Sequence, residues 1–302
     1  MKNKTIEKLG IGIIAFEGLE HIPNIISNFK FAMQKTGISS YYIVLFLQKY
    51  DYLQQTTIAE DDIELALKLK ELDFIDDVMF FMYDSKKRTN DIELEKRNTL
   101  LNILDDNDCS HNIIIDSDEF YTKDSLVKSM NYIIENNPDI TYCQYLNYIN
   151  EENILLYKYA EGMYVPFITR KGFSFGLPTI YSNVVNLPSD ETRRYIYDKN
   201  KDSLHIFPFE DIHMKHMNLM RIDLHKKFKV WSSQHCVDNY EEKVNDMIKE
   251  VENFDYEKWK GKSLDFYFLG PGLKVYNCSN EFDFEYDWRN MMSKTISECK
   301  YC

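Results

Sequence analysis

Three carboxylates directly follow a short apolar run in this chain. Asp116, Asp118 and Glu119 come immediately after 113–115, which is three isoleucines in succession. Successive β-branched residues predict a buried strand. Clustered carboxylates repel one another and raise each other's pKa unless a cation is near. Carboxylate oxygens suit Mg²⁺ or Mn²⁺, which often bind a phosphate as well. The motif therefore predicts a site for a metal and a phosphate compound, and the alternative is a solvated acidic turn.

A second cluster lies much later in the sequence. Glu210, Asp211, His213 and His216 fall within seven residues. A carboxylate can act as a general base, and a neutral imidazole is a good additional ligand for Mn²⁺. The two histidines are three residues apart, so on a helix they would share one face. The alternative for each histidine is a structural role in the core.

The elements that must position these residues alternate along the first half of the chain. Apolar runs predict strands over 11–16, 41–47, 78–83 and 113–115, with helical patterns over 22–33, 61–72, 92–104 and 125–134 between and after them. Such alternation indicates βαβ units and a mainly parallel sheet. Ligands bind at the carboxyl ends of the strands in such sheets, and Asp116 follows the fourth strand.

The pattern changes after residue 140. A long strand over 140–149 opens a region, 140–185, where we expect antiparallel strands with turns at Gly162, 171–172 and 176–178. Residues 240–254 have the charge pattern of a solvated helix. We expect one catalytic domain over 1–225 and a mostly helical C-terminal extension over 226–302.

The composition narrows the class of protein. The 302 residues, 44% of them hydrophobic, suffice for one large domain or two small ones. A net charge of −13 argues against a nucleic-acid binder and against docking on anionic lipid. The six cysteines are scattered, and Cys299 with Cys302 would need two further ligands to hold zinc. No apolar run is long enough for a transmembrane segment and no signal peptide is recognisable, so we expect a cytoplasmic protein.

A hydrophobic strand ending in Asp-x-Asp, in a chain that opens with a strand, resembles the GT-A fold glycosyltransferases, most closely those of family 2. The similarity covers roughly residues 9–226. It implies an α/β fold in which a Rossmann-like, mixed but mainly parallel sheet is flanked by helices. It also implies Mn²⁺ or Mg²⁺, a nucleoside-diphosphate sugar donor that we expect to be UDP-linked, and a hydroxyl acceptor on a glycan or a protein.

The resemblance also implies roles in the metal site. The last Asp of the motif, Asp118, would bind the metal, and the first, Asp116, would contact the metal or the ribose. Ser117 lies between them and would share the contact with the donor. His216 resembles a histidine that completes the metal shell in some family members, with His213 as the second candidate.

Donor contacts follow from the resemblance as well. The loop after the first strand would hold the base, and here it is Ala15, Phe16 and Glu17. Asp84, at the end of a later strand, is our candidate for a further nucleotide contact. Arg97 lies in the predicted helix before the motif and would bind the diphosphate, because its planar fork can bond two oxygens. Its flanking residues are larger than is usual in the family.

An inverting transfer needs a general base, and the resemblance favours Asp211, with Glu210 as the alternative. Two other classes remain open. Haloacid-dehalogenase-like phosphohydrolases also use a strand ending in Asp-x-Asp. They need Thr or Val four positions after the first Asp, where this chain has Phe120. An inactive domain that binds a glycan or serves as a scaffold is the third class.

Overall fold

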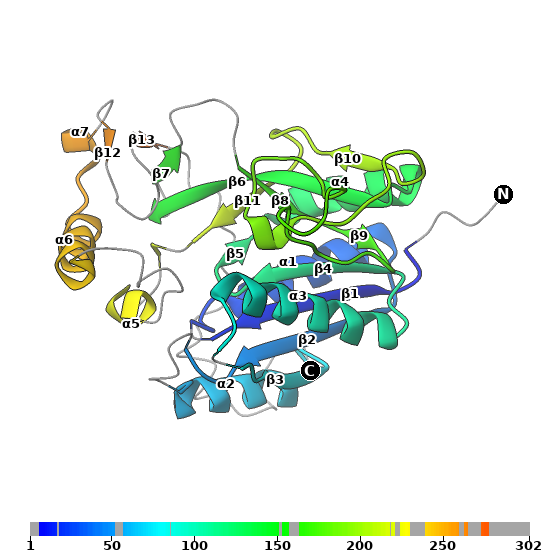
Figure 1. Cartoon of the computed structure of the whole chain (residues 1–302), viewed down its shortest axis with the longest axis horizontal. Helices are drawn as coiled ribbons and strands as arrows, with labels where there is room; N and C mark the ends of the chain where they lie inside the picture. Colours follow the sequence, from blue (N-terminus) through cyan, green and yellow to red (C-terminus); the bar gives the residue numbers. More distant parts are fainter. Residues whose placement is uncertain are drawn as a thin grey trace.

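The structure is a computed structural model that combines two β-sheets with helices (Figure 1). It describes residues 6–16, 18–51, 57–84, 86–150, 153–156, 163–217, 219–220, 224–229, 239–259, 263–264 and 273–277. Its sheets contain parallel and antiparallel strands and are flanked by helices. The predicted mixed α/β class is confirmed, and the architecture is consistent with a Rossmann-like GT-A fold.

The first sheet has the strand order β3-β2-β1-β4-β9. Its parallel strands are β1 (Leu9–Ala15), β2 (Tyr41–Gln48), β3 (Asp77–Phe81) and β4 (His111–Asp116). The short β9 (Thr169–Arg170) runs antiparallel to β4. β1 is buried along its whole length, as expected for a central parallel strand covered on both faces.

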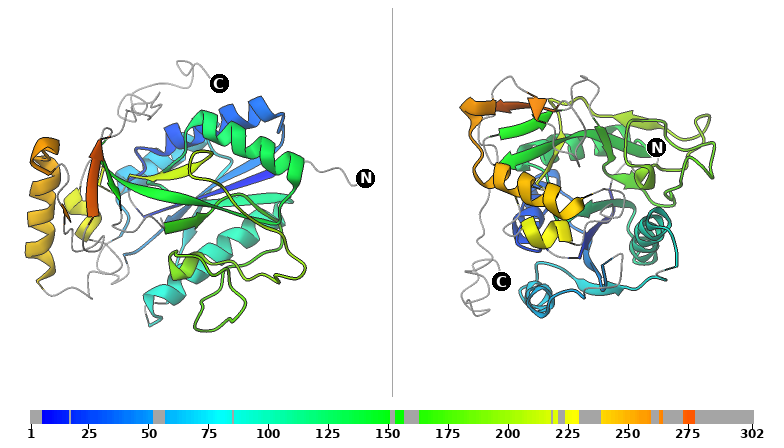
Figure 2. Two further views of the ribbon diagram at one scale, coloured as in Figure 1. Left: turned by 90° about the horizontal axis from the view of Figure 1, so that it is seen from above. Right: turned by 60° about the vertical axis from the view of Figure 1, so that its left-hand side comes forward.

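Helices cover both faces of this sheet (Figure 2). α1 (Ile22–Thr36), α2 (Glu60–Glu71) and α4 (Lys123–Asn136) share a core with the odd-numbered residues of β1 and β4, such as Ile13. On the opposite face, α3 (Thr89–Asp106) packs against even-numbered residues. Because side chains alternate across a strand, this division decides which helix each strand residue meets.

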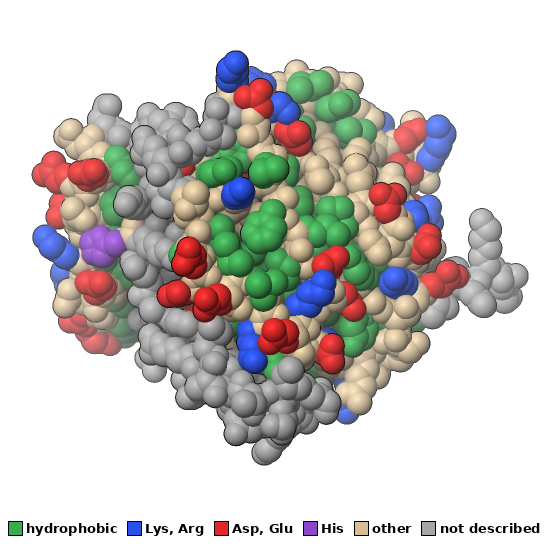
Figure 3. Space-filling model, turned by 90° about the horizontal axis from the view of Figure 1, so that it is seen from below, with side chains coloured by type: hydrophobic (Ala, Val, Ile, Leu, Met, Phe, Trp, Pro, Cys, Tyr) green, Lys and Arg blue, Asp and Glu red, His purple; other side chains and the backbone are tan. Residues whose placement is uncertain are grey.

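The edge strand β3 leaves part of this sheet exposed. Phe80 in β3 is 46% exposed and Met82, just beyond it, is 65% exposed. Leu67 on the neighbouring α2 is 49% exposed. The face of the molecule seen in Figure 3 carries hydrophobic side chains between charged ones.

The second sheet is built around the long strand β6 (Ile140–Asn150), with the order β12-β13-β7-β6-β11-β5 and with β8 and β10 also paired to β6. β11 is parallel to β6 and antiparallel to β5. The other strands are β5 (Glu119–Phe120), β7 (Asn153–Leu156), β8 (Met163–Pro166), β10 (Leu204–Ile206), β11 (His213–His216), β12 (Ser263–Leu264) and β13 (Leu273–Asn277).

The remaining elements are a 3-10 helix, η1 (Glu191–Arg193), and three helices, α5 (Leu224–Lys229), α6 (Tyr240–Glu252) and α7 (Tyr256–Trp259). α5 and α6 form a small core with Ile149. β13 pairs with β7, so strands as well as helices occur after residue 226. The boundary at 225 stays a prediction. In the part of the chain that the structure describes, no helix is long and apolar enough to cross a bilayer.

The structure differs from the predicted elements in two places. The segment that contains the two late histidines is the strand β11, so residues three apart point to opposite faces. Between residues 171 and 203 the chain forms turns, isolated bridges and η1 in place of regular strands. The predicted turn at Gly162 lies outside the described residues.

Candidate functional site

The carboxyl ends of β1, β2 and β4 meet at one edge of the first sheet. In the parallel register, Ile14 lies opposite Asp116 and Ala15 opposite Leu47. The amide of Ser117 donates to the carbonyl of Ile14 at 2.9 Å. Ala15 and Phe16 therefore adjoin the Asp-x-Asp motif, as the sequence predicts for neighbouring parallel strands.

Two other predicted nucleotide contacts are less directly placed. Asp84 follows β3, which is the edge strand, and it is exposed. Its carboxylate accepts a hydrogen bond from the amide of Lys86 at 3.0 Å. Glu17 lies outside the described residues.

Asp116 is held by two arginines. It lies on the same strand face as Ile114, which packs in the α3 core, and there its Oδ2 accepts from Arg97 at 3.1 Å. The same oxygen accepts from Arg193 at 2.6 Å. Burial alone would raise the pKa of Asp116, but the Arg193 and Arg97 guanidinium groups hold that pKa below its ordinary value. Asp116 is therefore an anion at neutral pH.

Arg193 also forms an ion pair with the third carboxylate of the motif, Glu119. Its Nη1 lies 2.5 Å from Oε1 of Glu119, and Oε2 of Glu119 accepts from the amide of Asp116 at 3.1 Å. Burial raises the pKa of Glu119, against the opposing effect of Arg193. Arg193 thus stabilises the turn between β4 and β5 by pairing with Asp116 and Glu119.

The pairing of β5 with β11 brings Asp118 and His216 together. His216 lies opposite Glu119 in the register, and the amide of Met217 donates to the carbonyl of Asp118 at 2.8 Å. Nε2 of His216 is then 3.7 Å from Oδ1 of Asp118. Residues predicted from two distant motifs therefore meet at the carboxyl end of β4.

A hydrogen bond at the other ring nitrogen of His216, Nδ1, orients the ring. Nδ1 lies 2.8 Å from Oδ1 of Asn147, which is its register partner in β6. An amide oxygen can only accept, so Nδ1 is the donor in this bond, and Nε2 is the ring nitrogen that faces Asp118. Metal-binding histidines are commonly oriented in this way, by a hydrogen bond from the second ring nitrogen.

Lys227 of α5 completes the surroundings of Asp118. Its Nζ lies 2.7 Å from Oδ2 of Asp118, whose side chain is 6% exposed. The sequence reasoning missed Lys227 and Arg193, because each reaches the motif from a remote segment with no local pattern to mark it. A nearby buried network continues this polar region, in which Lys96 donates to Gln48 at 2.8 Å and to Glu93 at 2.6 Å.

Hydrogen-bonding capacity is left over at this edge of the sheet. Oδ1 of Asp116 and Nε of Arg97 are buried and have no hydrogen-bond partner among the described residues. Buried polar atoms normally find a protein, water or ligand partner. Within the described ranges no three His, Cys, Asp or Glu side chains gather closely enough to hold a metal by themselves.

The structure does not bring the remaining predicted residues to Asp118. His213 begins β11 and stacks on Phe209 at 4.3 Å, about 10 Å along the strand from His216. Asp211 lies further back, on the turn before β11, and pairs with Lys128. Glu210 is exposed on the same turn.

Comparisons with known proteins found weak structural similarity. No family model matches the chain, and no curated protein matches it in sequence. The crystal structure of S. aureus TarS is similar with a TM-score of 0.33 and 13% identity, over 46% of this chain and 22% of that chain. The crystal structure of S. aureus TarS 1–349 in complex with UDP-GlcNAc has a TM-score of 0.31 and 12% identity, over 46% of this chain and 35% of that chain. The match spans about a third or less of these chains, and likeness at this TM-score does not establish a shared fold or activity.

Proposed function

We propose that this chain is a metal-dependent glycosyltransferase that moves a sugar from a nucleoside diphosphate, with UDP as the expected carrier, to a hydroxyl of a glycan or protein. The observation that carries the proposal is the meeting of Asp118 with His216 at the carboxyl end of β4, beside the anchored Asp116. This is the edge of a parallel sheet at which nucleotides bind.

Asp118 and His216 fit a divalent ion. Their 3.7 Å separation is shorter than two metal–ligand bonds of about 2.1 Å each, so one ion can contact both. Mg²⁺ and related ions commonly take few protein ligands and complete their shell with phosphate oxygens and water. A two-residue set is therefore sufficient when the donor supplies the rest.

The ion pair with Lys227 is compatible with this assignment. Nζ of Lys227 contacts Oδ2 of Asp118, whereas His216 lies nearest to Oδ1. A carboxylate has about four lone-pair sites, so the lysine leaves room for a metal on the other oxygen. Its positive charge would add to the attraction for a diphosphate.

The arginines account for the donor side of the proposal. Arg97 and Arg193 place two permanent positive charges beside Asp116, and the spare Nε donor of Arg97 suits a phosphate oxygen. The spare Oδ1 of Asp116 suits a ribose hydroxyl. When bound, the metal acts as a Lewis acid that neutralises the charge of the departing diphosphate.

The general base stays open within the proposal. Asp211 and Glu210 remain the residues suggested by the family resemblance, and a base there would make the transfer inverting. Geometry gives them no support, since both precede β11 while Asp118 lies beyond its far end. Replacing Asp211 by Asn removes its ability to accept a proton. The rate of sugar transfer by the Asp211→Asn variant therefore tests whether Asp211 is the general base.

Hydrolysis of small phosphorylated compounds separates the three classes of protein. Incubation with UDP-sugars and Mn²⁺ should release UDP slowly, because water can replace the acceptor, and EDTA should stop the release. A phosphohydrolase would cleave p-nitrophenyl phosphate, and an inactive binding domain would cleave neither compound. Release of UDP that is unchanged in the Asp118→Asn variant would contradict the proposal.

A further inference from the structure

Lys227 and His216 lie at different oxygens of the Asp118 carboxylate. Nζ of Lys227 is 2.7 Å from Oδ2, and Nε2 of His216 is 3.7 Å from Oδ1. The side chains of Asp118 and Lys227 are 6% and 15% exposed, so salt and water screen this ion pair less than they would screen a pair on the surface. The carboxylate to which we assign the metal therefore has a cation from the chain itself beside it.

The charges around the Asp-x-Asp motif balance within the chain. Asp116 and Glu119 pair with arginines, and the neighbouring Lys96 pairs with Glu93 at 2.6 Å. Among the described residues, the ion pairs of this region join equal numbers of carboxylates and cations, namely Asp116, Asp118, Glu119 and Glu93 with Arg97, Arg193, Lys227 and Lys96. A divalent ion added alone would leave an excess of positive charge, which is unfavourable where screening is weak.

A diphosphate would offset this excess. It brings negative charge, and its oxygen atoms can bind a metal and an ammonium group at the same time. The ammonium group of Lys227 lies at the end of a flexible four-carbon side chain, so it can exchange Oδ2 of Asp118 for a phosphate oxygen without a shift of the backbone. Lys227 therefore opposes an ion that binds alone and favours an ion that binds together with a diphosphate.

The helix that carries Lys227 is fixed by its own packing. Leu224 and Phe228 of α5 are buried in the small core that α5 forms with α6. The hydroxyl of Tyr240 also donates to the carbonyl of Phe228. Residues outside the Asp-x-Asp motif thus hold Lys227 beside Asp118, so its ammonium group can be removed without a change in the core of the first sheet.

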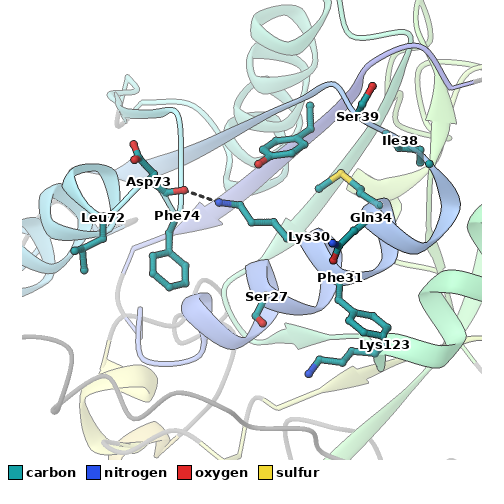
Figure 4. A pocket seen from close by; sticks show the side chains of 13 residues that line it. Ser27, Lys30, Phe31, Gln34, Ile38, Ser39, Leu72, Asp73, Phe74 and Lys123 are labelled. Carbon is teal, nitrogen blue, oxygen red and sulfur yellow. Dashed lines mark hydrogen bonds between the residues drawn. The ribbon is translucent and has the colours of Figure 1, made fainter. Parts of the chain in front are cut away.

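Lys30 is a half-buried lysine that lies far from this site. It is in a groove beside α1, where its Nζ donates to the carbonyl oxygen of Asp73 at 2.5 Å (Figure 4). Nζ also lies 5.7 Å from the ring centroid of Tyr41, the first residue of β2. Gln48 is the last residue of β2, and seven residue steps along a strand span about 23 Å. Lys30 is therefore near the edge of the sheet opposite to Asp116, and it serves as the matched control.

We propose that Lys227 makes the binding of a divalent ion at Asp118 depend on the diphosphate. Lys227 acts here as a positioning residue, which neutralises Asp118 in the chain alone and pairs with the diphosphate when the donor binds. The proposal rests on the proposed function and adds to it a coupling between the ion and the donor. The two ligands should raise each other's affinity by the same factor, and Lys227 should increase that factor.

Calorimetric titrations of the full chain with MnCl₂ alone, and with UDP in the presence of Mn²⁺, test the proposal. Lys227→Gln should bind Mn²⁺ alone at least about tenfold more tightly than the parent, because the repulsion between two cations is lost. The same variant should bind UDP in the presence of Mn²⁺ at least about threefold more weakly, because an ion pair with the diphosphate is lost. A damaged fold would weaken both, so the opposite signs identify the coupling.

Three further variants control the comparison. Lys227→Met, which keeps the apolar part of the side chain, should behave like Lys227→Gln. Lys227→Arg keeps the positive charge and should stay close to the parent in both titrations. Lys30→Gln removes a half-buried lysine from the groove beside α1 and should bind Mn²⁺ and UDP like the parent. Thermal unfolding midpoints show which variants fold.

Two results would overturn the proposal while the proposed function stands. The neutral variants of Lys227 could bind Mn²⁺ alone no more tightly than the parent does. They could also bind UDP in the presence of Mn²⁺ as tightly as the parent. Failure of the parent itself to bind UDP in the presence of Mn²⁺ would contradict the proposed function, and this proposal with it.

Discussion

At the scale of single residues, the site depends on which side chains the strands bring face to face. Asp116 is on the same face of β4 as Ile114 and therefore meets α3, where Arg97 lies. His216 ends β11 beside Asp118, whereas His213 begins the strand. The two histidines thus form a matched pair, one at the site and one remote from it.

Replacing His216 by Gln should weaken Mn²⁺ binding at least about tenfold, because the ring nitrogen Nε2 that faces Asp118 is lost. His213→Gln is the control in the same strand and should bind Mn²⁺ like the parent. Calorimetric titration with MnCl₂ in the presence of UDP measures both. Equal weakening in the two variants would mean that neither histidine is a specific ligand.

Replacing Arg193 by Gln should destabilise the protein by about 3–5 kcal/mol, since it leaves Asp116 and Glu119 without a shared cation in a buried site. Arg194→Gln changes the next residue, whose guanidinium contacts a carbonyl at 3.3 Å, and should cost about 1 kcal/mol. Urea unfolding compares them. A similar cost for both variants would show that the two ion pairs of Arg193 contribute no more to stability than an ordinary hydrogen bond.

At the scale of elements, the sequence predicts the strands and helices around the site but not all of its contacts. The strand before Asp116 and the helix bearing Arg97 could be inferred because hydrophobic periodicity is local. Arg193 and Lys227 reach the motif from a 3-10 helix and from α5, and tertiary packing alone decides that. The shared face predicted for His213 and His216 assumed a helical period, but pairing with β5 and β6 makes the segment a strand.

The contact between α3 and β1 is close enough to test. A Cβ built on Gly12 would lie 2.6 Å from Cδ2 of Leu100, so Gly12→Ala should push α3 outward and cost about 1–3 kcal/mol. The double variant Gly12→Ala with Leu100→Ala should lose less than the sum of the two single losses, because the second change creates the space. A double-mutant cycle by urea unfolding measures this. Additive losses would contradict the proposed contact.

At the scale of the whole molecule, acid should lower the free energy of unfolding through the protonation of His111. Burial, assisted by Arg170, lowers the pKa of His111 from 6.5 to about 4. Between pH 6.5 and about pH 4, His111 of the unfolded chain therefore binds a proton that His111 of the folded protein does not. Stability should be complete above about pH 6.5 and should fall by up to about 3 kcal/mol as the pH drops to 4.

His111→Gln removes this titration and serves as the comparison for the parent. The free energy of unfolding in urea, measured from pH 7.5 to pH 4, should fall more steeply for the parent than for the variant. The difference between the curves should develop between pH 6.5 and 4. Parallel curves would show that His111 stays accessible to protons in the folded protein.

Binding of UDP to the intact chain tests the central claim most directly. Calorimetry should show UDP binding with Mn²⁺ that weakens strongly in EDTA. Asp118→Asn should lose the Mn²⁺-dependent part, because the carboxylate facing His216 is gone. Asp108→Asn is the control, since Asp108 is 96% exposed and its left-handed backbone accommodates Asn, and it should bind like the parent. The account would be contradicted if the parent bound UDP equally with Mn²⁺ and EDTA, or if Asp118→Asn retained the full effect of Mn²⁺.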